Sequence, residues 1–242
     1  LEYNWSKIGG DIVGTDNNNV YGLNTIINYS GTRIAYSYKN LERTSFTEFK
    51  VSVKDYDETL MLWNEIGNFT YTSSDSYNNL EDNIAFNNSG NIIAIGSFIY
   101  DSNGNEYSGD VKVYEYDNQS WSMLGNEIRN SDTSQGFGTS VSLNAHGNRI
   151  SIGNDGENGK NVVIYEYNND TNSWTLIGTI VTGEEYSGTK VRLNKLGNIL
   201  IFSNIYSSSG IGDINGYIYD ENENSWNEYS LINNIYLDDI QT

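Results

Sequence analysis

Short apolar runs separated by polar, glycine-containing turns follow one another along the whole chain. A central stretch shows this clearly, because TSVSLN (139–144), RISIG (149–153), NVVIYEY (161–167) and SWTLIG (173–178) are separated by turns such as HGN and NNDTN. Val, Ile and Tyr suit a pleated, half-buried surface, and Gly and Asn tolerate the positive φ of tight turns. No stretch of about ten residues or more has the 3.6-residue period of a helix. The pattern predicts an all-β protein made of short strands.

The same group of strands recurs along the chain. Tryptophans mark it at spacings of 58, 58, 53 and 52 residues: Trp5, Trp63, Trp121, Trp174 and Trp226. Ile or Leu and then Gly follow the first four of them, at Gly9, Gly67, Gly125 and Gly178. A glycine turn lies 23 to 27 residues after each of the same four, at Gly31, Gly90, Gly147 and Gly197, and a tyrosine shortly precedes each later tryptophan, at Tyr56, Tyr116, Tyr167 and Tyr219. These landmarks indicate four repeats, at about residues 10–67, 68–125, 126–178 and 179–232.

A four-stranded sheet of about 50 residues cannot bury both of its faces alone, but such sheets bury them when they stack around an axis. We therefore predict that residues 1–242 form a single domain, a β-propeller of four-stranded antiparallel blades with four full repeats. A tryptophan that recurs at one position of the repeat is expected to lie buried between blades, because its side chain removes a large apolar area from water.

The two ends of the chain do not fit a simple ring. An extra tryptophan-containing strand, residues 3–9, has no preceding strands of its own, and we expect it to be an outer strand that closes the ring. Residues 235–240 are expected to form another strand or to lie on the ring. In the alternative, the two ends jointly form a partial fifth blade, or the chain assembles with further repeats or other chains.

Two stretches of the third repeat resemble known propeller repeats. NVVIYEYNNDTNSWTLIG (161–178) resembles the kelch motif, and GFGTSVSLNAHGNRISIG (136–153) resembles the FG-GAP repeats of integrin α-subunits. Both resemblances imply a propeller. The chain departs from kelch repeats in lacking their glycine pair after the second strand. It departs from integrin-type repeats in lacking calcium-binding aspartates in the first hairpin, and the WD dipeptide of WD40 repeats is absent.

Charge and composition narrow the partners. The net charge of −19 repels phosphate backbones and anionic lipid surfaces, so we predict no nucleic-acid partner and no membrane insertion. No apolar run reaches the roughly 18 residues of a spanning helix. The chain has no Cys, which excludes disulfides, thiolate catalysis and Cys-type zinc sites.

Few residues offer chemistry. The single histidine, His146, falls in a turn whose counterparts in the other repeats are Ser30, Ser89 and Leu196, so we predict an exposed turn residue rather than a catalytic base. Arg33 and Arg149 share one position at a hairpin exit, which favours surface placement.

One loop has the pattern of a metal site. Asp101, Asn103 and Asn105 place oxygen ligands at alternate positions, as calcium loops do, and are the candidate metal ligands. No other cofactor is predicted.

The sequence therefore favours a protein that is not an enzyme. We predict a non-catalytic binding or structural module, extracellular or on the surface of a cell or virion, that serves adhesion or assembly with a protein or glycan ligand. Loops 39–48, 97–109, 154–160 and 204–215 are expected to bind, because binding residues concentrate on loops of a rigid scaffold. One alternative is an intracellular kelch-like adaptor for protein interactions. The other is a propeller that binds or hydrolyses glycans.

Overall fold

The computed structural model describes residues 5–14, 19–40, 47–73, 83–99, 108–129, 136–154, 161–181, 187–204 and 212–229, and these contain strands and turns but no helix. The first sheet consists of β1 (Asn19–Ile27), β2 (Arg33–Asn40), β3 (Thr47–Asp57) and β4 (Leu62–Ser73). The second consists of β5 (Ile84–Phe86), β6 (Ile92–Ile99), β7 (Ser108–Tyr116), β8 (Trp121–Met123) and the short β9 (Ile128–Arg129). The third consists of β10 (Phe137–Leu143), β11 (Arg149–Asn154), β12 (Asn161–Asn168) and β13 (Ser173–Val181). The fourth consists of β14 (Ser187–Leu193), β15 (Ile199–Asn204), β16 (Asp213–Asp220) and β17 (Ser225–Glu228).

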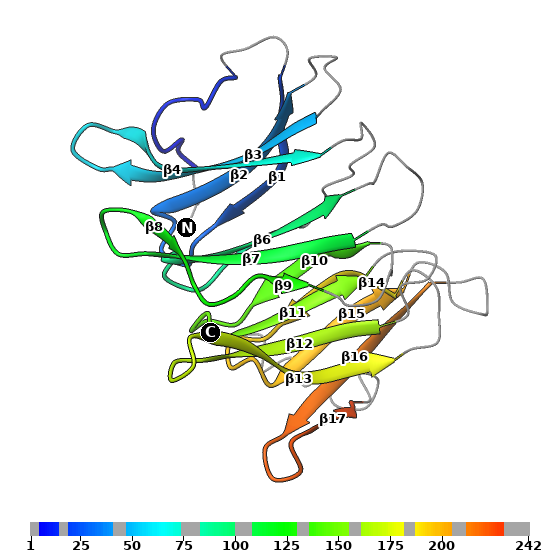
Figure 1. Cartoon of the computed structure of the whole chain (residues 1–242). Helices are drawn as coiled ribbons and strands as arrows, with labels where there is room; N and C mark the ends of the chain where they lie inside the picture. The colour runs from blue at the N-terminus through cyan, green and yellow to red at the C-terminus, as the bar shows by residue number, and fades with distance from the viewer. Residues whose placement is uncertain are drawn as a thin grey trace.

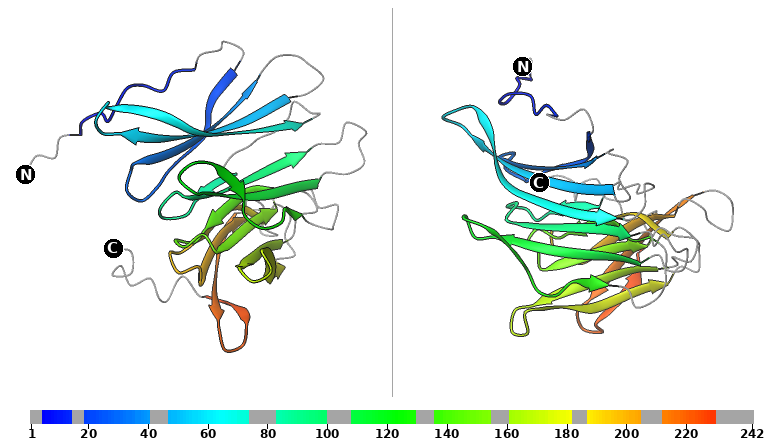
Figure 2. Two further views of the ribbon diagram at one scale, coloured as in Figure 1. Left: turned by 60° about the vertical axis from the view of Figure 1, so that its left-hand side comes forward. Right: turned by 45° about the horizontal axis from the view of Figure 1, so that its top comes forward.

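Each sheet is an antiparallel meander whose strands follow the chain order. In the second sheet, β8 and β9 both pair with β7, at different parts of its length. The four sheets stack in chain order like the leaves of a fan, with the first and the fourth at its two ends (Figure 1). Figure 2 shows the same fan from two further sides, with the sheets twisted against one another. The predicted fold class is confirmed: the protein is an all-β propeller of four-stranded antiparallel blades. In the part of the chain that the structure describes, no helix is long and apolar enough to span a membrane.

The core lies between successive sheets. Val51 and Val53 of β3 pack with Ile93 and Ile95 of β6. The second and third sheets share a cluster that includes Val111 and Ile152, and Val162, Ile164 and Phe202 belong to the cluster between the third and fourth sheets. Burying apolar side chains from two facing sheets is the main favourable contribution to such packing, at roughly 25 cal/mol per Å².

The inner turns link the sheets around the axis. In each sheet an Asn precedes the glycine turn, and its side-chain oxygen accepts the backbone N–H five residues later; these asparagines are Asn28, Asn87, Asn144 and Asn194. Backbone hydrogen bonds then run from turn to turn, from Tyr29 N to Asn88 O (3.0 Å), from Asn88 N to Ala145 O (3.0 Å) and from Ala145 N to Lys195 O (2.9 Å). The turns of all four sheets are therefore held in one connected series.

The recurring tryptophans occupy equivalent places, but the prediction that all are buried is only partly right. Trp174 is 5% exposed, whereas Trp63, Trp121 and Trp226 are half-buried at the outer edges of their sheets. Each of the four indoles lies against the glycine of the preceding tryptophan phrase, as Trp174 does against Gly125. Glycine suits this position because a Cβ at Gly178, for example, would lie 2.4 Å from the indole of Trp226, closer than a real Cβ approaches.

The prediction that the N-terminal segment forms an outer strand is wrong for its described residues. The side chain of Trp5 is 99% exposed, and residues 5–9 form no strand, because no sheet pairs with their backbone. Gly9 nevertheless lies against Trp63 and Tyr56, as the other phrase glycines lie against the next tryptophan. The segment therefore takes the place of an outer strand without forming one. Residues 3–4 and 235–240 lie outside the described residues.

Candidate active site

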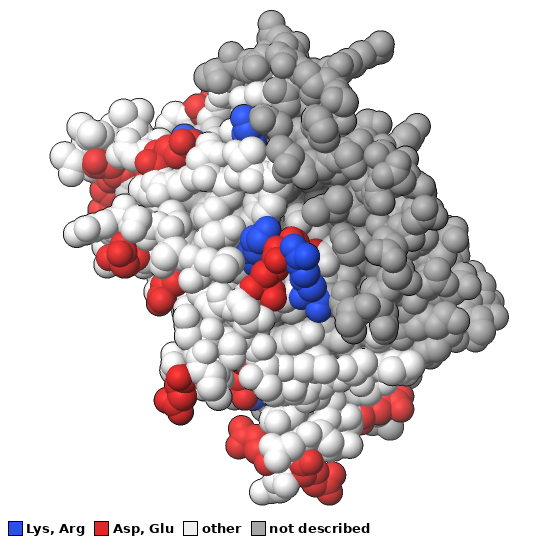
Figure 3. Space-filling model, in the orientation of Figure 1, with Lys and Arg blue, Asp and Glu red and all other residues white. Residues whose placement is uncertain are grey.

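A cluster of charged side chains lies on the second sheet, on the face toward the first sheet. Successive side chains of β7 point to opposite faces of the sheet. Asp110 and Lys112 therefore lie on this face, while Val111 and Val113 are buried on the other, against the third sheet. In Figure 3, basic and acidic side chains gather over the place where β7 and β9 lie. Asp110 is 5% exposed, which is unusual for a carboxyl group without charged partners.

The short strand β9 brings two further charged residues to this face. After β8 the outer strand is interrupted at Gly125, whose φ is 75°, a conformation that glycine adopts at little cost. Pairing with β7 resumes at β9, where Arg129 stands opposite Asp110. The interruption carries Glu127 to the side of Lys112.

Lys112 lies between two carboxyl groups. Its Nζ is 3.3 Å from Oδ2 of Asp110 and 2.9 Å from Oε1 of Glu127. Arg129 donates from Nε to Oε2 of Glu127 over 2.7 Å, and the hydroxyl of Ser97 donates to Oδ1 of Asp110. Glu127 and Lys112 remain about one quarter exposed and Arg129 more so, and the cluster therefore opens to solvent on the Glu127 side.

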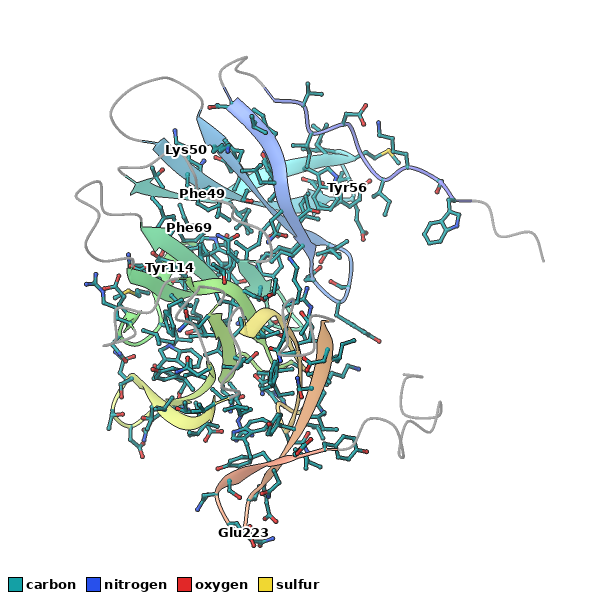
Figure 4. The ribbon with its side chains drawn as sticks, turned by 90° about the vertical axis from the view of Figure 1, so that its right-hand side faces the viewer. Phe49, Lys50, Tyr56, Phe69, Tyr114 and Glu223 are labelled. Atoms are coloured by element: carbon teal, nitrogen blue, oxygen red, sulfur yellow. The ribbon has the colours of Figure 1, made fainter. Side chains whose placement is uncertain are left out.

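Aromatic residues of the first two sheets close the inner side of the cluster. Phe69 and Tyr114 face one another with ring centroids 4.5 Å apart (Figure 4). The hydroxyl of Tyr71 lies 3.3 Å from that of Tyr114, and Nζ of Lys112 lies 5.4 Å from the centre of the Tyr71 ring. Burial raises the pKa of Tyr71 far above its ordinary value, so this hydroxyl stays protonated.

The two carboxyl groups titrate in opposite directions. Burial raises the pKa of Asp110, and its hydrogen bond with Glu127 raises it further. The pKa of Glu127 falls to about 2, first because of the hydrogen bond with Asp110 and then because of Lys112 and Arg129. Between these two pKa values the pair holds one proton and one negative charge. In many active sites, two carboxyl groups whose environments separate their pKa values serve as the acid and the base.

The residues singled out from the sequence lie elsewhere. Asp101, Asn103 and Asn105 lie outside the described residues, as do parts of the four predicted binding loops. Within the described ranges, no group of three or more His, Asp or Glu residues could hold a metal ion. His146 is an exposed turn residue, as predicted.

The predicted surface placement of Arg33 and Arg149 is wrong. Arg149 is 8% exposed, and its guanidinium donates to the carbonyl of Gly197 (3.0 Å) and to Glu166 (2.7 Å). Arg33 makes the equivalent bond to the carbonyl of Gly90 (3.0 Å). Both side chains reach from one sheet to the turn of the next, because the hairpin exit faces the neighbouring sheet rather than solvent.

Three comparisons place the chain among known proteins. No family model matches it, and no curated protein matches it. Similar solved structures support the fold described above. A protein from Bacteroides uniformis described as a proposed 6-phosphogluconolactonase is 11% identical, with a TM-score of 0.53 over 85% of this chain and 52% of that one. A protein from Lactobacillus plantarum is 14% identical, with a TM-score of 0.55 over 88% of this chain and 55% of that one.

A third similar structure is prolyl oligopeptidase B from Galerina marginata, which is 7% identical, with a TM-score of 0.50 over 90% of this chain and 30% of that one. The chain thus spans about half the length of the first two structures and 30% of the third. The fold and these comparisons define the class of protein as a β-propeller. They do not show the kelch or FG-GAP families specifically.

The predictions of a non-catalytic adhesion or assembly module and of a protein that is not an enzyme are wrong. The finding that overturns them is the similarity to a protein described as a proposed 6-phosphogluconolactonase. Those predictions relied on the scarcity of His and Cys and on the lack of an acid–base set in the sequence. Asp110 and Glu127 are 17 residues apart and meet only because β9 returns to β7. The one signal in the sequence is a pair of charged residues at alternate positions of the valine-rich strand DVKVYEY (110–116).

Proposed function

We propose that this chain is a propeller hydrolase for sugar-derived lactones, with Asp110, Lys112, Glu127 and Arg129 as its active site. The observation that carries the proposal is the geometry of the cluster, in which Lys112 lies between the buried Asp110 and the more exposed Glu127, and Arg129 contacts Glu127 from the solvent side. The similar structure described as a proposed 6-phosphogluconolactonase supplies the substrate class.

The geometry gives each residue a role in ester hydrolysis. Glu127 is the exposed carboxylate of the pair, and it accepts a proton from the attacking water as the new C–O bond forms. Arg129 and Lys112 stabilise the oxyanion that develops on the lactone carbonyl. The ring C–O bond then breaks, and the leaving ring oxygen takes a proton back from Glu127. Asp110 touches no substrate in this scheme and is a positioning residue, which holds Lys112 and Glu127 in place and whose pKa is raised by burial and by Glu127.

The charge of the chain bears on the choice of lactone. With a net charge of −19, the protein repels a phosphorylated sugar at long range. We therefore expect δ-gluconolactone to be hydrolysed with a higher kcat/KM than its 6-phosphate.

Glu127→Gln tests the proposal. Hydrolysis of δ-gluconolactone should fall by about 100-fold or more, as losses of a general base usually do. Glu221→Gln is the matched control, because Glu221 is an exposed turn residue of the fourth sheet, and this variant should retain full activity. Absence of turnover above the spontaneous rate with both lactones, or equal rates for the wild type and Glu127→Gln, would overturn the proposed function.

A further inference from the structure

Among the described residues, no other sheet lies on one of the two faces of the first sheet. Ile34 and Tyr36 point to this face, and they are half-buried there. Their counterparts in the later sheets are buried against the preceding sheet: Ile93, Ile95, Ile150, Ile152, Leu200 and Phe202. Ile27, which pairs with Ile34, is 61% exposed. The first sheet therefore presents to other molecules a surface that the remaining sheets use for their core.

The N-terminal segment turns this face into a cleft. Residues 10–13 lie over the outer part of the sheet, and in Figure 4 this segment passes over the region of Tyr56. Two hollows of about 520 Å³ and 340 Å³ lie between this segment and the sheet, and they share Ile12, Tyr21 and Tyr36. Both volumes fall in the range of small-molecule sites. A further sheet could not pack flat on this face, because residues 10–13 already cover part of it.

The lining of the cleft combines aromatic rings with hydrogen-bonding groups. Tyr21 and Tyr38 are stacked with ring centroids 4.7 Å apart, and Trp63 lies at the same end of the cleft. Beside them, Glu65 accepts a hydrogen bond from Ser52 (2.9 Å) and lies 3.9 Å from Lys54. The other end has an aliphatic floor that includes Ile27 and Ile34.

The tyrosines are particular to this sheet. The positions of Tyr36 and Tyr38 hold Ile95 and Ser97 in the second sheet, and Phe202 and Asn204 in the fourth. Under an apolar sheet the tyrosine hydroxyls would lose water without gaining partners, which costs free energy. Tyrosine suits a surface that is apolar on its ring face and wet at its hydroxyl.

We propose that this cleft binds a neutral saccharide, separately from the cluster on the second sheet. A sugar ring packs its C–H groups against the Tyr38 ring, beside Trp63, and directs its hydroxyls to Glu65 and Lys54, which offer an acceptor and a donor. A neutral sugar fits better than an anionic one, because Asp11 and Glu65 both line this end of the cleft. The site does not depend on the proposed hydrolysis, since it lies on the opposite face of the first sheet from Tyr71 and Lys112.

Calorimetric titration of the full chain with a panel of neutral mono- and oligosaccharides tests the proposal. At least one sugar should bind with 1:1 stoichiometry, and Tyr38→Ala should weaken that binding by 10-fold or more. Tyr38→Phe keeps the ring and should lose less, which separates ring stacking from a general disturbance of the sheet. Tyr29→Ala is the control, because Tyr29 is an exposed tyrosine on an inner turn outside the cleft, and it should bind as the wild type does.

Three results of the titrations would overturn the saccharide site, and a fourth comes from the oligomeric state. The first three are the absence of binding across the panel, binding that Tyr38→Ala leaves unchanged, and binding that Glu127→Gln removes, since the last would place the sugar at the charged cluster. A concentration-dependent doubling of mass in light scattering that Ile34→Asp abolishes would show that a second copy of the chain occupies the cleft, and this too would overturn the proposal. Inactivity toward lactones alone would leave the expected saccharide binding intact, so the two proposals fail separately.

Discussion

At the scale of single residues, the five tryptophans show how one side chain serves different environments. Trp174 is buried, and its indole N–H donates to the carbonyl of Leu124 over 2.9 Å. The same residue type at Trp5 is almost fully exposed. The sequence phrase around each is nearly the same, and the difference comes from whether a sheet is present to cover the ring.

Trp174→Ala should lower the free energy of unfolding by about 3–5 kcal/mol, because it leaves a cavity between two sheets and an unpaired carbonyl. The measurement is a urea melt followed by far-UV circular dichroism. Trp5→Ala is the control and should change stability by less than about 0.5 kcal/mol. Similar losses for the two variants would contradict the burial difference.

The carboxyl pair predicts a specific pH dependence. As the pH rises through the raised pKa of Asp110, the pair loses its shared proton, and a second negative charge beside Glu127 opposes the developing oxyanion. The wild-type kcat/KM should therefore fall on the alkaline side of that pKa. Asp110→Asn stays neutral at every pH and should remove this alkaline decline.

On the acid side, the wild type should lose activity only as the pH approaches the Glu127 pKa of about 2. In Asp110→Asn this acid limb should move upward, because the amide donates a weaker hydrogen bond to Glu127 than the carboxyl group does. The check is a pH–rate profile for the two proteins. Superimposable profiles would count against a shared proton.

At the scale of strands and sheets, the sequence predicts the architecture well. The turn HGN at residues 146–148 joins β10 to β11, and the tyrosine and tryptophan landmarks pair across neighbouring strands, as Tyr167 does with Trp174. These features are local and recur in each repeat, so composition and spacing reveal them. The interruption of the outer strand before β9 is particular to the second sheet, and the repeat pattern therefore conceals it.

The candidate site could not be predicted for the same reason. Asp110 and Lys112 are visible in the sequence as charges in a strand, but Glu127 and Arg129 join them only through the register of β9 on β7. Burial between two sheets then sets the pKa values, and burial depends on which face of β7 the next sheet covers. The sequence of one strand alone reveals neither its pairing register nor which of its two faces a neighbouring sheet covers.

Close contact between sheets depends on glycine at one repeated position. A Cβ on Gly153 of β11 would lie 2.0 Å from the carbonyl oxygen of Gly188 in the fourth sheet. The same relation holds between Gly96 of β6 and Gly138 of the third sheet. The backbones of neighbouring sheets therefore approach at these points more closely than any side chain permits.

Gly153→Ala should destabilise the fold by about 3 kcal/mol, because backbone rather than a flexible side chain must move to make room. Gly10→Ala is the control, since nothing lies within 4 Å of a Cβ at that position. Thermal unfolding of both variants checks the prediction. A melting temperature of Gly153→Ala equal to that of the wild type would show that the sheets can separate without cost.

At the scale of the whole molecule, the sheets form a line of neighbours rather than a single shared core. The first sheet packs on the second, the second on the third and the third on the fourth, each through its own cluster of buried residues. A fan of this kind has two end faces. One of them, on the first sheet, carries the tyrosine-lined cleft, and the other bears the exposed Ile214 of β16.

The backbone bonds that run from Tyr29 through Asn88 and Ala145 to Lys195 couple the sheets in the same linear order. In such an array each unit is stabilised by the units on either side, so an end sheet has one stabilising neighbour and a middle sheet has two. Fluctuations that expose amide hydrogens to solvent therefore begin at the ends of the line and travel inward. The second and third sheets, which have a neighbouring sheet on each of their two faces, should therefore exchange their amide hydrogens most slowly.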